Sequence, residues 1–67
     1  MDSEALRVRM AVKNITQKEL ANKIGISPAA LNNKLHKKVN FDIDEAMDIC
    51  KALDIRDSNE IVNIFFS

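Results

Sequence analysis

The only glycine and the only proline of the chain lie three residues apart, in the stretch KIGISPAALNNK. Glycine tolerates the left-handed backbone that ends many helices, and proline suits the first position of the next helix. With so few other turn residues and only three aromatic residues, all Phe, the abundant Leu, Ile, Val and Ala favour helices over a sheet. Gly25 and Pro28 therefore predict a sharp corner between two helices.

Capping signals before this corner predict two helices. Ser3 is placed to cap a first helix that runs to about Lys13, and Asn14 then suits a left-handed turn. The sequence TQKE at 16–19 forms a capping box, in which the threonine hydroxyl and the glutamate carboxylate each accept from the other residue's backbone amide. It predicts a second helix that stops at Gly25.

A third helix is predicted from Pro28 to about His36, with Ser27 as its N-cap. At about 100° per residue, Leu31 and Leu35 point to one side of this helix and suit a core. The other side carries small and polar residues, namely Ala29, Asn32, Asn33 and His36. The spacing therefore predicts one buried face and one outward face.

The rest of the chain predicts two more helices. A second capping box begins at Asp42 and starts a helix that ends near Leu53. Asp57 or Ser58 then caps a short fifth helix. About five short helices give an all-α fold with one domain over 1–67, because a chain of this length has no room for a second core.

The net charge of zero conceals two halves of opposite sign. Residues 7–38 hold eight lysines and arginines against one glutamate, which gives +7. Residues 39–67 hold two basic and seven acidic residues, which gives −5, and the N-terminal acids supply the remaining −2. Such asymmetry is expected when one surface of a protein meets a polyanion such as DNA.

Two short helices, a glycine turn and an outward polar face make a helix-turn-helix, here at about 16–36. The sequence TQKELANKIGISPAALNNKL resembles the lambda-repressor/Cro-like (XRE-type) helix-turn-helix family, with its Gln-x-x-x-Ala-x-x-x-Gly-[Ile/Val]-Ser pattern. FDIDEAMDICKALDI resembles the helix after the motif, so the resemblance covers roughly residues 6–55. The ending NEIVNIFF is similar to small regulators of phages and low-GC Gram-positive bacteria.

The resemblance implies a small transcriptional regulator of repressor or Cro type that binds a double-stranded DNA operator. Its recognition helix, at about 28–36, would lie in the major groove. Gln17 would meet the phosphate backbone, and Ser27 and His36 would lie at the two ends of the DNA-facing surface. The implied base-facing residues are Pro28, Ala29, Asn32 and Asn33, and the implied phosphate-facing loop residues are Lys37, Lys38 and Asn40.

Side-chain chemistry suggests what this face would recognise. An asparagine amide can form two hydrogen bonds with adenine, and an alanine methyl can touch the methyl of thymine. We therefore expect Asn32 or Asn33 to bind an adenine and Ala29 to contact a thymine.

Three positions depart from the family pattern. Lys37 stands where many members have glycine, and Lys34 stands where an apolar residue is frequent, with Leu35 taking over the packing. Met10 replaces the arginine of an Arg–Glu pair that often ties the first helix to the third. These changes bear on the pitch of the recognition helix and leave the fold intact.

Other functional classes find little support. The acidic residues from Asp42 to Asp48 lack the spacing and glycine of a calcium loop, and they suit a helix N-terminus. His36 has no second ligand at zinc spacing, and Cys50 lies among apolar residues like a buried core residue. A single glycine makes no phosphate loop. We expect no catalytic residues, metal, cofactor or small-molecule substrate.

The C-terminal end is unusually apolar for so small a chain. Its apolar residues cover most of a helix circumference, so that one face closes the core and the other is left for a partner. We expect a homodimer interface at Ile61, Ile64, Phe65 and Phe66. The alternative from another class is a helical protein–protein adaptor that uses this end and does not bind DNA.

The sequence also indicates a location. It has no apolar run near 18 residues and no secretory leader, and its single cysteine has no partner for an internal disulfide. These features predict a soluble, cytoplasmic protein without a membrane partner.

Overall fold

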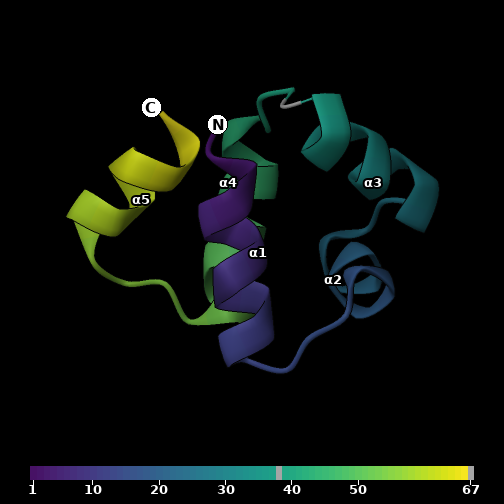
Figure 1. Cartoon of the computed structure of the whole chain (residues 1–67), viewed down its shortest axis with the longest axis horizontal. Helices are drawn as coiled ribbons and strands as arrows, with labels where there is room; N and C mark the ends of the chain where they lie inside the picture. The colour runs from purple at the N-terminus through teal and green to yellow at the C-terminus, as the bar shows by residue number, and fades with distance from the viewer. Residues whose placement is uncertain (38, 67) are drawn as a thin grey trace.

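The computed structural model describes residues 1–37 and 39–66, and these form five helices without a strand (Figure 1). The helices are α1 (Ser3–Val12), α2 (Gln17–Ile24), α3 (Pro28–Lys37), α4 (Ile43–Leu53) and α5 (Ser58–Phe65). The all-α fold of about five short helices is thereby confirmed. None of the helices in this described part has the length and apolarity that a membrane span needs.

The first helix begins one residue earlier than the sequence predicts. Asp2, not Ser3, is the N-cap of α1, and its carboxylate accepts the Ala5 amide at 3.1 Å. Ser3 is instead the first helical residue and is buried. The Asp2 amide donates to the Ile64 carbonyl at 2.7 Å, so the start of α1 is also tied to α5.

The other capping predictions agree with the structure. Thr16 and Asp42 each form a complete capping box, at the starts of α2 and α4 respectively. Asp57 caps α5. After α1, Asn14 adopts the predicted left-handed conformation with a φ of 55°. The helix boundaries are therefore set locally, by side chains that satisfy the free amides of each first turn.

All five helices contribute to one core, in which α2 packs against both α3 and α4, and α1 packs against α5. In Figure 1, α2 and α3 lie on one side of α1 and α4, and α5 lies on the other. The largest fully buried side chains come from the first four helices: Leu6, Leu20, Leu31, Leu35, Ile49 and Leu53. Leu31 and Leu35 thus form the predicted buried face of the third helix.

The C-terminal helix divides the residues expected at a dimer interface. Ile64 and Phe65 are only 4% and 5% exposed, because they close the core of the single chain. Phe65 also packs edge-to-face on Phe41, with ring centroids 6.2 Å apart. This placement corrects the expectation for Ile64 and Phe65. Ile61, which is half-buried, and Phe66, which is 69% exposed, keep surface for a partner.

Replacing Gly25 by alanine should destabilise the fold through the backbone alone. Gly25 has a φ of 79°, and a Cβ built there meets no atom within 4 Å, so the cost is that of a left-handed alanine, about 1 kcal/mol. Chemical denaturation should therefore show a lower free energy of unfolding for Gly25→Ala. The control Asn22→Ala, at an exposed position inside α2, should be neutral or slightly stabilising. Equal stability of Gly25→Ala and the wild type would contradict the turn assignment.

Candidate nucleic-acid interface

The corner between α2 and α3 is built around Gly25. Its left-handed backbone lets its own amide and the Ile26 amide donate to the Ala21 carbonyl, the latter at 3.0 Å. Ala21 is fully buried, and its small side chain lets the two helices approach closely. Ile26 is partly buried and packs against the core. These contacts end α2 and set the direction in which the chain leaves it.

The third helix begins immediately after the corner. The Ser27 hydroxyl accepts the Ala30 amide at 3.1 Å, which is the predicted N-cap bond. Pro28 occupies the first helical position, where the missing amide hydrogen has no cost. With Leu31 and Leu35 anchored in the core, the start of α3 is fixed and its opposite side faces outward.

That outward side carries most of the predicted DNA-contacting residues. The side chains of Asn32 and Asn33 are exposed and make no hydrogen bond to another residue that the structure describes. Figure 1 shows α3 at the edge of the molecule, on the side away from α5. The residues of the set that are exposed on α3 or at its start are Ser27, Pro28, Ala29, Asn32, Asn33, His36 and Lys37.

The remaining predicted residues lie before and after α3 in the chain. Gln17 is the first residue of α2 and is half-buried. Asn40 is exposed in the link after α3, and its side-chain oxygen accepts from the Met1 ammonium at 3.3 Å, a contact that the sequence does not predict. Lys38 lies outside the described residues.

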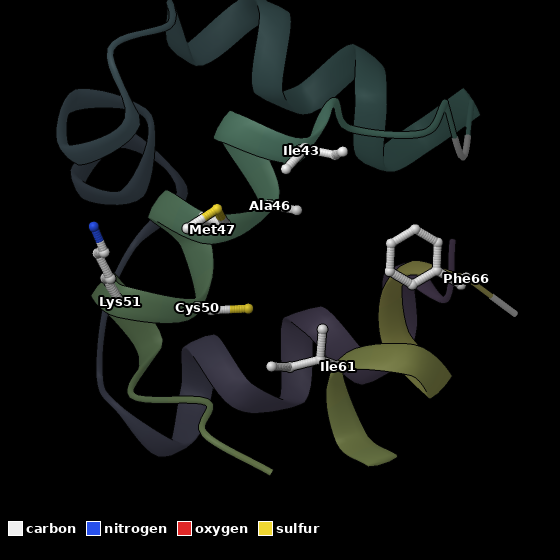
Figure 2. Close-up of a pocket in the computed structure, with 7 residues that line it drawn as sticks. All are labelled: Ile43, Ala46, Met47, Cys50, Lys51, Ile61 and Phe66. Carbon is white, nitrogen blue, oxygen red and sulfur yellow. The ribbon is translucent and has the colours of Figure 1, made fainter. Parts of the chain in front are cut away.

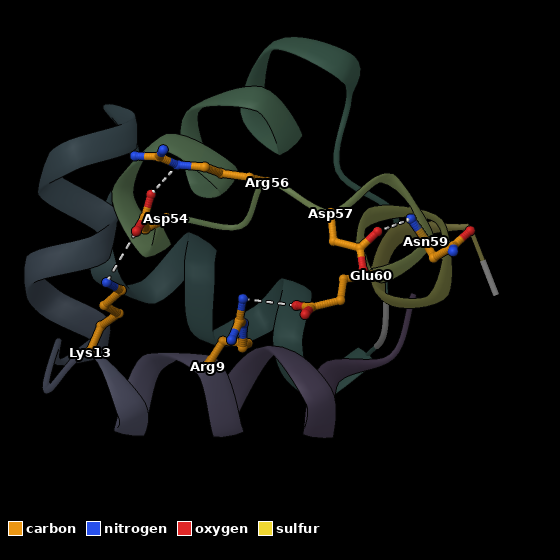
Figure 3. A network of polar contacts seen from close by, with 7 residues as sticks. All are labelled: Arg9, Lys13, Asp54, Arg56, Asp57, Asn59 and Glu60. Carbon is orange, nitrogen blue, oxygen red and sulfur yellow. Dashed lines mark hydrogen bonds and ion pairs between the residues drawn. The ribbon is translucent and has the colours of Figure 1, made fainter.

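Arg9 of α1 and Lys13, the residue that caps its C-terminus, are held in ion pairs within the chain. Arg9 pairs with Glu60 at 2.8 Å, and Lys13 pairs with Asp54 at 3.5 Å, as Figure 3 shows. Arg56 holds the same Asp54 carboxylate at 2.7 Å. The Arg56 hydrogen bond and the charges of Arg56 and Lys13 lower the pKa of Asp54. Arg9 and Lys13 therefore stabilise contacts with the acidic half of the chain.

The lysines of α2 and the end of α3 have no such partners. Lys18, Lys23 and Lys37 are exposed and form no ion pair within the described chain. Lys34 behaves differently, because its ammonium lies 3.2 Å from the Glu45 carboxylate of α4. Among the described residues, Arg7 of α1 and Lys51 of α4 are likewise exposed without an ion pair. The positive charges of α2 and of the end of α3 are thus available to a polyanion that meets the corner.

An apolar groove lies between α4 and α5, away from α3. Cys50 and Ile61 face the space between the two helices, and Phe66 lies at its far end (Figure 2). The groove has a volume of about 340 Å³. At the rim of the groove, Ile43 is 71% exposed. Cys50 is partly buried, and this burial raises the pKa of its thiol. The full lining is Ile43, Ala46, Met47, Cys50, Lys51, Ile61 and Phe66.

The spacing of apolar residues along α4 is a sequence signal for this groove. Ile43, Met47 and Cys50 recur at i, i+4 and i+7, which places them on one side of α4. Ile49 and Leu53 form a separate buried stripe on the same helix. Ile49 and Leu53 are the stripe that packs in the core, so the second stripe is left to line the groove. Within the described residues, no cluster of three metal-binding side chains accompanies either surface.

The fold and this corner define a helix-turn-helix domain. A family model of the Cro/C1-type helix-turn-helix DNA-binding domain matches residues 5–64, and the chain belongs to this family. The predicted resemblance to the XRE-type family is thereby confirmed, over a longer span than the predicted 6–55, whereas the similarity of the ending to phage and Gram-positive regulators stays a prediction. No curated protein and no solved structure gave a significant match to the chain.

The capping box of α2 should make stability depend on pH in acid. Hydrogen bonds from the Thr16 amide and hydroxyl lower the pKa of Glu19 from its ordinary value of 4.5. The folded carboxylate therefore binds a proton less readily than the unfolded one. Its contribution to stability is complete above pH 4.5 and is lost as the pH falls below the folded-state pKa.

We therefore expect Glu19→Gln to have a lower melting temperature than the wild type at neutral pH. The difference should shrink as the pH is lowered below 4.5, because the wild type then loses the same charge. The control Glu4→Gln removes a carboxylate from the first turn of α1 without breaking a capping bond. A difference between Glu19→Gln and the wild type that stays constant through acid pH would contradict this role for the carboxylate.

Proposed function

We propose that the chain is a transcriptional regulator of repressor or Cro type that binds a specific double-stranded DNA operator with α3 in the major groove. One observation carries this proposal. The outward side of α3 presents Asn32 and Asn33, whose side chains make no hydrogen bond to another described residue, opposite the face that Leu31 and Leu35 bury in the core. Exposed asparagines on the second helix of a helix-turn-helix suit contacts with base edges.

The start of α3 supplies the sequence-specific contacts. Residues near the N-terminus of a recognition helix contact base edges, and the position of Pro28 and Ala29 in the first turn of α3 supports the proposal that they face bases. Ala29 is small enough for close approach and offers its methyl to a thymine. Asn32 and Asn33, one turn further along α3, offer amides to adenine.

Residues around α3 supply contacts with phosphates. Gln17 lies in the first turn of α2, where free backbone amides and the helix dipole favour an anion. Lys37 and Asn40 lie at the other end of the recognition helix and can contact the backbone there. Such contacts provide much of the affinity and make it fall steeply with salt concentration. A bound regulator would act by occupying the operator and excluding polymerase.

Selection from a random duplex pool tests this function. We expect enrichment of one short motif containing A·T pairs, and retention on DNA that weakens as salt is raised. Recovery of random sequences would contradict operator recognition. Absence of salt-dependent retention would instead favour the adaptor alternative, in which the protein uses its apolar groove and does not bind DNA.

Changing the asparagines should relax the sequence preference locally. Asn33→Ala or Asn32→Ala removes a pair of hydrogen bonds to adenine, worth about 1–3 kcal/mol of discrimination at that base pair. Selection with each variant should therefore lose the preference at one position and keep the others. The control Asn63→Ala removes an exposed asparagine from α5 and should leave the motif unchanged. Unchanged motifs for both Asn32→Ala and Asn33→Ala would contradict the assignment.

We further propose that two copies bind the operator through a symmetric contact at the α4–α5 groove. The chain carries both halves of such a contact, namely the groove and the exposed Phe66 ring at its end. A two-fold axis would let each Phe66 insert into the partner's groove, and it would allow two recognition helices to lie about 34 Å apart on the duplex. The selected motif would then be palindromic.

Sedimentation of a charged variant tests the dimer. Phe66→Asp would place a carboxylate inside an apolar contact, so we expect it to shift the protein towards the monomer. The control Val8→Asp makes the same change at an exposed valine of α1 and should leave the association unchanged. A wild-type protein that stays strictly monomeric at high concentration, with and without DNA, would contradict this proposal.

A further inference from the structure

Lys34 is a basic residue of the recognition helix that points inward. Its side chain is 26% exposed, and its ammonium lies 3.2 Å from the Glu45 carboxylate of α4. The same ammonium lies 5.4 Å from the centre of the Phe41 ring, within the range of a cation–π contact. Within the described residues, this is the ion pair that connects α3 to another helix. Lys34 is therefore directed to the interior side of α3, between α3 and the first turn of α4.

The group that Lys34 contacts is itself held in place. Glu45 is 17% exposed, and the oxygen that accepts from Lys34 also accepts the Asp42 amide at 3.1 Å. The Glu45 amide in turn donates to the Asp42 carboxylate at 2.8 Å, which completes the capping box of α4. Phe41 packs edge-to-face on Phe65, which belongs to the core. Lys34 is thus attached to a carboxylate and a ring that α4 and α5 fix.

The two ends of α3 are therefore held differently. At its start, the Gly25 corner connects α3 to α2, and the Ser27 cap satisfies an amide in the first turn of α3 itself. In its second half, Lys34 joins α3 to α4 beside the buried Leu35. Leu31 and Leu35 already hold the buried side of α3 against the core. The Lys34 contact adds a directional attachment to α4, which further restricts the angle at which the outward face is presented.

We propose that Lys34 is a positioning residue that sets the tilt of α3 through Glu45 and Phe41, and that its charge is not used on a DNA phosphate. The proposal rests on the proposed function for its effect on binding, because the tilt decides which bases Asn32 and Asn33 reach. A partly buried ion pair with two further contacts is a better holding device than an exposed one.

Salt dependence separates positioning from phosphate contact. Removing a phosphate-contacting lysine lowers the slope of log affinity against log salt by about 1 and weakens all sequences equally. We expect Lys34→Met to leave this slope unchanged and to lower the ratio of specific to non-specific affinity about tenfold, through lost base contacts. Lys34→Arg keeps the cation and should stay close to the wild type. The control Lys37→Met should lower the slope and keep the ratio.

Glu45→Gln changes the ion-pair partner of Lys34 and so tests whether the two residues act together. Its amide oxygen can still accept the Asp42 amide, whereas the charge that holds Lys34 is gone. Loss of a negative charge would strengthen simple electrostatic attraction to DNA. A tenfold fall in the specificity ratio for Glu45→Gln, not increased further in Lys34→Met/Glu45→Gln, is therefore the result expected of a shared positioning contact. A lower salt slope for Lys34→Met with an unchanged Glu45→Gln would overturn the proposal.

The orientation of α3 in the free protein gives a test that does not depend on DNA binding. Residual dipolar couplings of backbone amides should show α3 rotated relative to α4 in Lys34→Met and in Glu45→Gln, with the other helices unmoved. The wild-type orientation in both variants would overturn the proposal even if the DNA measurements agreed with it. A rotated α3 in a protein whose wild type shows no sequence preference would instead contradict only the proposed function. Far-ultraviolet circular dichroism of each variant confirms that it is folded.

Discussion

The left-handed turn at Gly25 is the constraint on which the arrangement of the other helices depends. Because the Gly25 and Ile26 amides share the Ala21 carbonyl, α2 ends there and the chain turns at once into the Ser27 cap of α3. The buried side of α3 then packs in the core beside α2, and as a consequence its opposite side faces outward. The positive φ of Gly25 thus determines the direction of α3, and with it the position of the surface on which the proposed function depends.

The charges of the chain perform two separate tasks. Arg9, Lys13 and Lys34 form ion pairs with the acidic half and hold helices together. The lysines of α2 and at the end of α3 stay exposed and give one side of the molecule its positive potential. The groove is lined by residues of α4, Ile61 of α5 and Phe66, and not by residues of α3, so a partner bound there would leave the outward face of α3 accessible. The sequence shows how many basic and acidic residues the chain has, and the fold determines which of the basic residues form ion pairs and which stay exposed.

Local chemistry made much of this fold predictable. The Thr16 and Asp42 boxes and the Gly25 turn depend on residues within a few positions, so the sequence contains the whole interaction. The predictions that the structure corrects, for Ser3 and for Phe65, concern places where segments distant in the sequence make contact. Ser3 is buried because the chain before α1 is tied to α5, and Phe65 is buried because it packs on Phe41. The inward direction of Lys34 and the groove likewise follow from the position of α4, and the contacts with DNA bases remain predictions.

The central claim is that the outward side of α3 is the surface that meets DNA. Titrating the isotopically labelled protein with a duplex that carries the selected motif tests it most directly, by mapping which backbone amides change their chemical shifts. We expect the largest changes to cluster in α3 from Pro28 to Lys37, at Gln17 and at Asn40, and to weaken at high salt. Changes confined to α4 and α5 around the groove, with α3 unaffected, would contradict it.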